Sequence, residues 1–197
     1  TLSAFAADAR ARESLLSEAG DRLRQELGKY AVSEDGEALE ERLIRTLIAA
    51  KKTLAVAESF TGGMLASRLI DVPGSSAAFD RGWITYSNRS KVEQLGVNQG
   101  TLDQGGAVSR ACALEMALGA KRASGADYAL ATTGIAGPSG ATDRKDVGLA
   151  FLACVGPSFE KTDTYVEEHR FRWDRNRNRL IAVYESLRML LRALSRS

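Results

Sequence analysis

The chain is poor in the residues on which many common catalytic and binding sites depend. Its 197 residues include one histidine, two cysteines and three prolines. A conventional zinc site needs several histidine or cysteine ligands close in space, and this chain has too few for one. A Ser-His-Asp triad would have to use His169, which lies far in sequence from the glycine-rich turns, so we interpret this histidine as a strand residue at the edge of the core. Neither GxxxxGK[ST] nor GxGxxG occurs, which excludes the nucleotide P-loop and the dinucleotide fingerprint.

An excess of charge of one sign and long hydrophobic runs are also lacking. The chain has 27 basic and 25 acidic residues, a net charge of +2, so its total charge does not indicate nucleic acid or a membrane surface as a partner. No apolar run approaches the roughly 20 residues that span a bilayer, and the charged first residues contain no signal-peptide core. We therefore expect a cytoplasmic location. Cys112 and Cys154 lie in apolar segments, and we expect them to be reduced and buried.

Helical and strand patterns alternate along most of the chain. Strands are predicted at 53–57, 82–87, 127–133, 147–155 and 161–173, with helices at 62–70, 88–95, 109–122 and 175–194. Strands separated by helices imply crossover connections and a largely parallel sheet covered on both faces. The short loop between the last two strands predicts an antiparallel hairpin. The predicted fold class is α/β, a three-layer α/β/α sandwich with a mixed, mostly parallel sheet.

The first part of the chain has a different character. Apolar residues keep helical spacing in a charged segment at 8–28, and "SEDGE" (33–37) then interrupts with a glycine and capping residues. We therefore predict a helical extension or linker remnant at 1–33 and one domain at 34–197. Because the apolar stripe of the extension has no obvious partner within that domain, we expect a homo-oligomer, a dimer or larger.

Three polar or glycine-rich turns follow predicted strands. They are "ESFTGG" (58–63), "YSNRSK" (86–91) and "TGIAGPSG" (133–140). In open α/β sheets, ligands gather where loops at the carboxyl ends of strands meet helix N-termini, and the N–H groups there favour a phosphate or carboxylate. The residues alone leave Ser59 open to three interpretations: a helix cap, an anion ligand or a nucleophile. Thr61 is an equally good candidate for the cap.

A serine nucleophile requires a base, and with histidine set aside the best candidate is a lysine whose pKa is lowered. Lys91 lies in the first turn of the helix after "YSN", although an ordinary solvated lysine is the simpler interpretation. Tyr86 is placed to relay or donate a proton. Arg175, in the first turn of the last helix, is placed to reach a phosphate.

Five segments together, in this order and spacing, resemble the C-terminal domain of the CinA family, the nicotinamide mononucleotide amidohydrolases: "TLAVAESFTGGMLASRLIDVPGSSAAF", "GWITYSNRSKVEQLGV", "GAVS", "TTGIAGPSG" and "DVG". The resemblance runs from about Glu37 to the C-terminus. It implies hydrolysis of the carboxamide of this pyridine nucleotide to nicotinate mononucleotide and ammonia, without a metal or cofactor. It also implies Ser59 as nucleophile, Lys91 as base and Tyr86 as a further catalytic residue. The substrate-binding residues it implies are Thr61, Gly62, Gly63, Thr133, Gly134, Gly137 and Arg175.

The chain departs from the family pattern beside these residues. Phe60 stands where the family usually has cysteine, and Trp173 stands where it has glycine. We expect these bulky side chains to narrow or reshape the pocket while leaving Ser59, Tyr86 and Lys91 in place. Two alternatives to an active amidohydrolase are a catalytically silent nucleotide-binding regulatory module and a competence or DNA-damage-associated factor.

Overall fold

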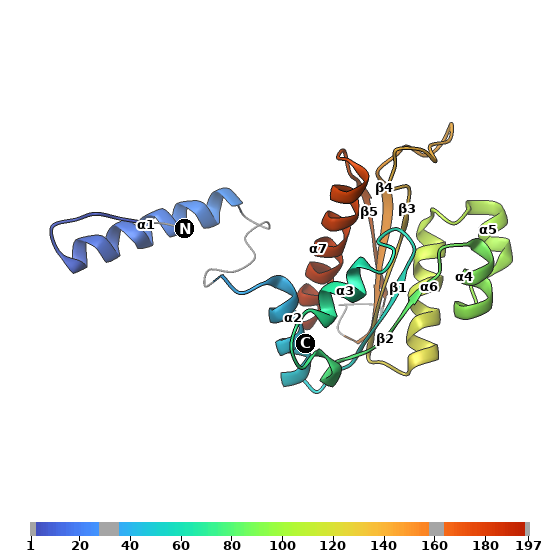
Figure 1. Cartoon of the computed structure of the whole chain (residues 1–197), viewed down its shortest axis with the longest axis horizontal. Helices are drawn as coiled ribbons and strands as arrows, with labels where there is room; N and C mark the ends of the chain where they lie inside the picture. The colour runs from blue at the N-terminus through green and yellow to red at the C-terminus, as the bar shows by residue number, and fades with distance from the viewer. Residues whose placement is uncertain (1–2, 28–35, 158–163, 196–197) are drawn as a thin grey trace. The chain divides into compact units, whose positions relative to one another are not determined.

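The computed structural model describes residues 3–27, 36–157 and 164–195 (Figure 1). It divides into two compact units, Thr1–Ala38 and Leu39–Ser197. The first unit contains α1 (Ala9–Leu27), close to the helix predicted at 8–28. Most of the predicted "SEDGE" interruption lies outside the described residues.

The second unit is built on a five-stranded sheet with the strand order β2-β1-β3-β4-β5. The strands are β1 (Leu54–Glu58), β2 (Phe79–Ile84), β3 (Tyr128–Gly134), β4 (Leu149–Val155) and β5 (Thr164–Arg170). Strand β1 pairs in parallel with β2 and β3, whereas β4 pairs antiparallel with β3 and β5. In the described sheet, β4 alone therefore runs against the others. The predictions of a mixed, mostly parallel sheet and of a final antiparallel pair are confirmed.

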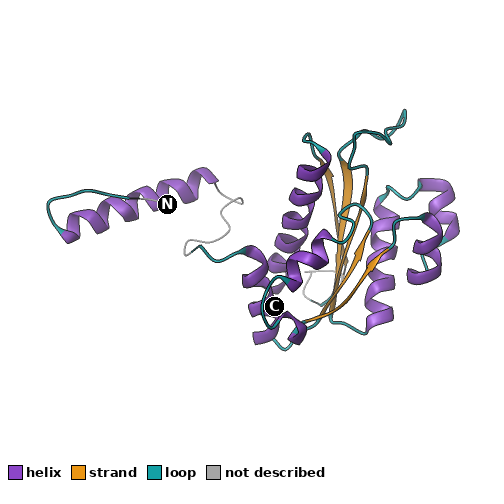
Figure 2. Ribbon diagram, in the orientation of Figure 1, coloured by secondary structure: helices purple, strands orange, loops and turns teal. Residues whose placement is uncertain are grey.

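Helices cover both faces of the sheet (Figure 2). One layer contains α2 (Leu39–Ala49), α3 (Met64–Ile70) and α7 (Arg175–Leu194), and the other contains α4 (Asn88–Leu95), α5 (Gln99–Gly105) and α6 (Arg110–Ser124). Helix α6 lies directly on the sheet with its small residues buried, whereas α4 and α5 pack against α6. Cys112 and Cys154 are both free and buried, as predicted. The predicted three-layer α/β/α fold is confirmed.

The largest differences from the predicted elements occur at β2 and α5. Strand β2 begins at Phe79 and ends at Ile84, earlier than predicted, because this edge strand exposes most of its residues and so lacks a clear apolar alternation. Helix α5 was not predicted because its seven residues include two glycines. Contacts outside the helix hold it: Asn98 caps its first turn, and Glu115 of α6 accepts from Thr101 at 2.6 Å.

The register of the parallel strands brings their ends to one edge of the sheet. Glu58, the last residue of β1, is paired with Ile84 on β2 and Thr132 on β3. The three turns singled out in the sequence leave the sheet from these ends, so crossover topology alone gathers them at one place.

Candidate active site

Ser59 and Lys91 meet at the carboxyl edge of the parallel strands. The Lys91 Nζ atom lies 3.1 Å from Ser59 Oγ and 2.7 Å from the carbonyl oxygen of Thr85. Lys91 is only 1% exposed, so it is not the solvated helix lysine of the simpler interpretation. Burial removes water from its ammonium group and lowers the pKa of Lys91. An amine in this state can accept a proton from the serine hydroxyl that it contacts.

The titratable group that acts most on the charge of Lys91 is a thiol, that of Cys112. Its helix α4 is preceded by the N-cap Ser87, which exchanges hydrogen bonds with Ser90 in a capping box and so fixes the first turn. Cys112, in the first turn of α6, lies close to the amine, and burial raises the pKa of this thiol to about 11. The thiol is therefore neutral at pH 7, and no carboxylate in the described part of the chain is bonded to Lys91.

Glu58 organises the turn that carries Ser59. Its fully buried carboxylate accepts hydrogen bonds from the N–H groups of Gly63 (2.9 Å), Leu65 (3.0 Å) and Ala66 (2.8 Å). These N–H groups at the start of α3 would otherwise lack partners and attract an anion. The protein's own carboxylate therefore occupies the position in which we expected a ligand phosphate. The helix-cap interpretation of Ser59 and Thr61 is not borne out, because α3 has no side-chain cap.

Thr132 of β3 holds the same turn from the neighbouring strand. Its carbonyl oxygen accepts from the N–H groups of Ser59 (2.9 Å) and Phe60 (3.3 Å), and its hydroxyl lies 2.8 Å from that of the buried Thr61. Within the described residues, the Gly62 N–H is left without an acceptor. It is therefore the N–H of this turn that remains free for a ligand.

Arg175 connects the other two turns at the same edge. Its Nη1 donates to the carbonyl oxygen of Gly137 at 2.7 Å, and its Nη2 donates to the hydroxyl of Tyr86 at 3.0 Å. Tyr86 is 64% exposed. The structure thus joins Tyr86 to the arginine predicted to bind phosphate, and it gives the Tyr86 hydroxyl no hydrogen bond to Ser59 or Lys91.

The remaining predicted residues of the third turn form its framework. The buried Thr133 hydroxyl donates to the carbonyl oxygen of Ala107 at 2.7 Å, which holds the "GAVS" loop against β3. A Cβ atom on Gly134 would lie 2.5 Å from the Leu149 carbonyl oxygen, so the backbones can approach this closely only at glycine. Gly137 has a φ of +92° and precedes a cis proline.

The two departures from the family pattern occupy different environments. Phe60 is 4% exposed, and its ring centroid lies 6.1 Å from that of Phe171. Its side chain is therefore part of the core next to Ser59. Trp173 is 56% exposed, with the guanidinium of Arg177 5.4 Å from its ring centroid.

Residues that sequence reasoning missed hold the turns in place from α7. The fully buried Asn178 donates to the carbonyl oxygens of Ala136 (3.1 Å) and Trp173 (2.9 Å). Arg179 donates to the carbonyl oxygen of Thr61 from both Nε (3.1 Å) and Nη2 (2.8 Å). One signal was available, because Asn178 precedes the buried Ala182 by one helical turn and so lies on the apolar face.

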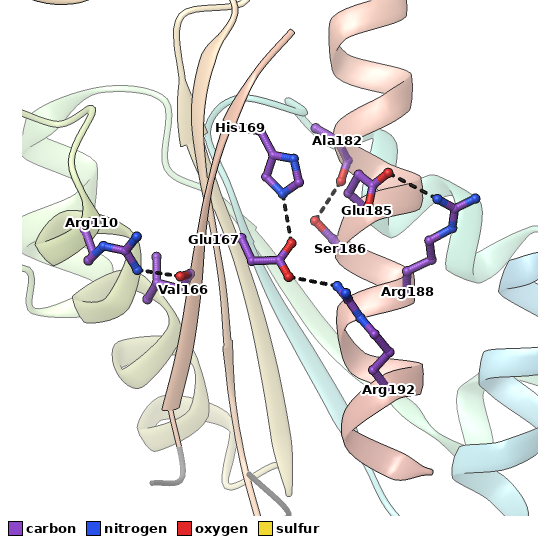
Figure 3. A network of polar contacts seen from close by, with 9 residues as sticks. All are labelled: Arg110, Val166, Glu167, His169, Ala182, Glu185, Ser186, Arg188 and Arg192. Carbon is purple, nitrogen blue, oxygen red and sulfur yellow. Dashed lines mark hydrogen bonds and ion pairs between the residues drawn. The ribbon is translucent and has the colours of Figure 1, made fainter. Parts of the chain in front are cut away.

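His169 belongs to a separate polar network (Figure 3). Its Nε2 lies 2.9 Å from Glu167 on β5, and Glu167 accepts from Arg192 of α7 at 2.8 Å. The hydrogen bond with His169 is the main cause that lowers the pKa of Glu167. This network ties β5 to α7, in agreement with the interpretation of His169 as a strand residue at the edge of the core. Among the described residues, no group of three or more histidine, cysteine, aspartate or glutamate side chains is placed to hold a metal ion.

The fold and this edge define a class: an α/β/α protein with a buried lysine bonded to a serine at the carboxyl ends of parallel strands. The family model of the CinA C-terminal domain matches residues 36–194, and the chain belongs to this family. None of the helices in the described ranges is long and apolar enough to cross a membrane.

Individual relatives agree with this assignment. The chain is 44% identical over 180 residues to a CinA-like protein of Geotalea uraniireducens, a match that covers 91% of this chain and 42% of the relative. It therefore spans about two fifths of the length of the curated relatives it matches. The solved structure of the competence/damage inducible protein CihA from Agrobacterium tumefaciens is similar at 40% identity with a TM-score of 0.73, covering 80% of this chain and 96% of that one. A CinA superfamily protein from Klebsiella pneumoniae has 34% identity, a TM-score of 0.75, and coverage of 80% and 96%.

Proposed function

We propose that this chain hydrolyses the carboxamide of nicotinamide mononucleotide, giving nicotinate mononucleotide and ammonia, with Ser59 as nucleophile and Lys91 as base. The observation that carries the proposal is the 3.1 Å contact between Lys91 Nζ and Ser59 Oγ, made by an amine that is 1% exposed. Membership of the CinA family supports the choice of substrate.

In the first half of the reaction, the neutral Lys91 amine takes the Ser59 hydroxyl proton as Oγ forms a bond to the amide carbon. The resulting tetrahedral intermediate carries a negative oxygen, which the free N–H of Gly62 is suited to stabilise. Lys91 then returns the proton to the amide nitrogen, the carbon–nitrogen bond breaks, and ammonia leaves. The product of this step is an ester between nicotinate mononucleotide and Ser59.

In the second half, water replaces ammonia. Lys91 accepts a proton from the water as its oxygen attacks the ester carbon, and it gives the proton back to Ser59 Oγ as the ester bond breaks. Nicotinate mononucleotide leaves, and the pair returns to its starting protonation.

The remaining groups fix the orientation of the substrate. Because Glu58 already fills the anion position at the start of α3, the 5′-phosphate must bind elsewhere. Arg175 is suited to this role, since its guanidinium has N–H groups beyond the two bonded to Gly137 and Tyr86. The nucleotide is then placed with its carboxamide at Ser59 and its phosphate at Arg175.

The experiment is an assay of ammonia release from nicotinamide mononucleotide by the wild-type chain and by Ser59→Ala and Lys91→Met. We expect release by the wild type and a loss of at least about a thousandfold in each variant, as for nucleophile or base removal in comparable hydrolases. Arg175→Gln should instead raise KM for the nucleotide more than it lowers kcat. Binding without any release by the wild type would favour a silent nucleotide-binding module over the proposed enzyme.

A further inference from the structure

One polar atom beside the serine–lysine pair has no assigned function. Thr85 lies between β2 and α4 and is completely buried, and its Oγ1 has no hydrogen-bond partner. The backbone of the same residue is fully used: its N–H donates to the carbonyl oxygen of Glu58 at 2.9 Å, and its carbonyl oxygen accepts from Lys91. Buried hydroxyl groups without partners are uncommon because their desolvation is uncompensated.

The lysine beside it also lacks a partner when it is charged. A neutral amine can donate one hydrogen to the Thr85 carbonyl oxygen and accept the hydroxyl proton of Ser59. Once Lys91 has taken that proton, its ammonium carries three N–H donors, and the described residues give it only the Thr85 carbonyl oxygen and Ser59 Oγ as acceptors. One buried N–H of a positive charge would then remain unsatisfied.

We propose that Thr85 is a positioning residue whose hydroxyl accepts this third hydrogen bond when Lys91 becomes protonated during the reaction. The Thr85 carbonyl oxygen is already 2.7 Å from Nζ, so the hydroxyl belongs to a residue that contacts the amine, and rotation about its Cα–Cβ bond can reorient it. The neutral amine also has a second N–H, but its hydrogen bond to the hydroxyl would be weaker, because a charged donor makes the stronger bond. Thr85 thereby stabilises the charged form of the base selectively, without entering the chemistry itself.

The inference rests on the proposed function for its role in turnover, but its physical core is a statement about the charge of Lys91. The substitution Thr85→Val keeps the shape of the side chain and removes the hydroxyl. We expect it to lower the pKa of Lys91 further, by about one pH unit, as for the loss of one hydrogen bond to a charged group. NMR titration of the chain with isotope-labelled lysines, with the Lys91 resonance assigned from Lys91→Met, measures this directly and requires no substrate.

The activity measurement has a matched prediction. Thr85→Val should lower kcat about tenfold with little change in KM, and the acid limb of the rate profile should move to lower pH by the same amount as the NMR titration. Thr85→Ser keeps a hydroxyl and should restore both values. Thr46→Val, the same replacement on α2 at a hydroxyl that bonds only the Arg42 carbonyl oxygen, is the control.

The outcomes separate the two proposals. An unchanged Lys91 titration in Thr85→Val overturns the role of Thr85, whatever the activity. If Thr85→Val shifts the Lys91 titration but the wild-type chain releases no ammonia, the role of Thr85 stands and the proposed function is overturned. If Thr85→Val fails to fold, Thr85→Ala replaces it in the titration, and an unchanged pKa of Lys91 there has the same adverse meaning.

Discussion

Glu58 is the residue whose replacement tests most sharply how the fold holds the serine turn. Glu58→Gln keeps the size of the side chain but replaces one carboxylate oxygen with a donor. The amide oxygen of the glutamine can still accept from the N–H groups of Gly63 and Leu65, which share Oε2 of Glu58. The amide NH₂ group then takes the place of Oε1, which lies 2.8 Å from the Ala66 nitrogen, and faces the Ala66 N–H. The loss of one charged hydrogen bond and the new donor–donor contact should lower the free energy of unfolding by about 1–3 kcal/mol. Glu58→Ala removes all three acceptors and should cost about 3–5 kcal/mol.

The assay is urea unfolding followed by circular dichroism, with the m-value compared between variants. Glu93→Gln is the control, because Glu93 is 61% exposed and forms only a 3.7 Å surface ion pair with Arg89; it should change stability by less than about 0.5 kcal/mol. The reasoning is refuted if Glu58→Gln is as stable as Glu93→Gln. In a folded Glu58→Gln protein, kcat should fall because Ser59 is the next residue along the chain.

Three further predictions concern ionisation and packing. Burial lowers the pKa of Lys91 below its ordinary 10.5, so the unfolded chain binds this proton more tightly than the folded chain does. The stability of the wild type relative to Lys91→Met should therefore rise as pH increases from the lowered pKa to 10.5. Urea unfolding at a series of pH values measures this. Gly134→Ala should destabilise the protein by about 2–4 kcal/mol in the same assay, since its Cβ would lie 2.5 Å from the Leu149 carbonyl oxygen and 2.6 Å from the Phe60 ring; equal stability would show that β3 and β4 can separate there. Cys112, buried with a pKa near 11, should resist a thiol reagent at pH 8 until the protein is unfolded in urea, and rapid labelling of Cys112 in the native protein would contradict the packing around Lys91.

Much of the architecture follows from features that the sequence displays locally. Buried strands such as β3 and β4 are continuous apolar runs, and their alternation with helices fixes the layers. Because parallel strands end at one edge, the predicted strands put Ser59 and Lys91 at the same edge, but only the resemblance to the CinA family implied that they form a pair. Strand β2 was placed less well, because an edge strand with exposed charges does not display its boundaries in a hydrophobic pattern.

The hydrogen-bonding partners within the site were not predictable in the same way. Glu58 was treated as the start of a polar turn, yet its carboxylate folds back onto N–H groups five to eight residues later. Thr132 and Arg179 reach the turn from segments 71 and 118 residues away in sequence. Such pairings depend on the orientation of individual side chains in the folded sheet, which periodicity does not encode.

The central claim, that Ser59 attacks the carboxamide carbon, is tested most directly by rapid mixing with nicotinamide mononucleotide, acid quenching and peptide mapping. We predict an ester of nicotinate mononucleotide on Ser59 during turnover, absent from Ser59→Ala, together with the loss of ammonia release in that variant. Ammonia release by Ser59→Ala at the wild-type rate, or an ester on a different residue, would contradict the account.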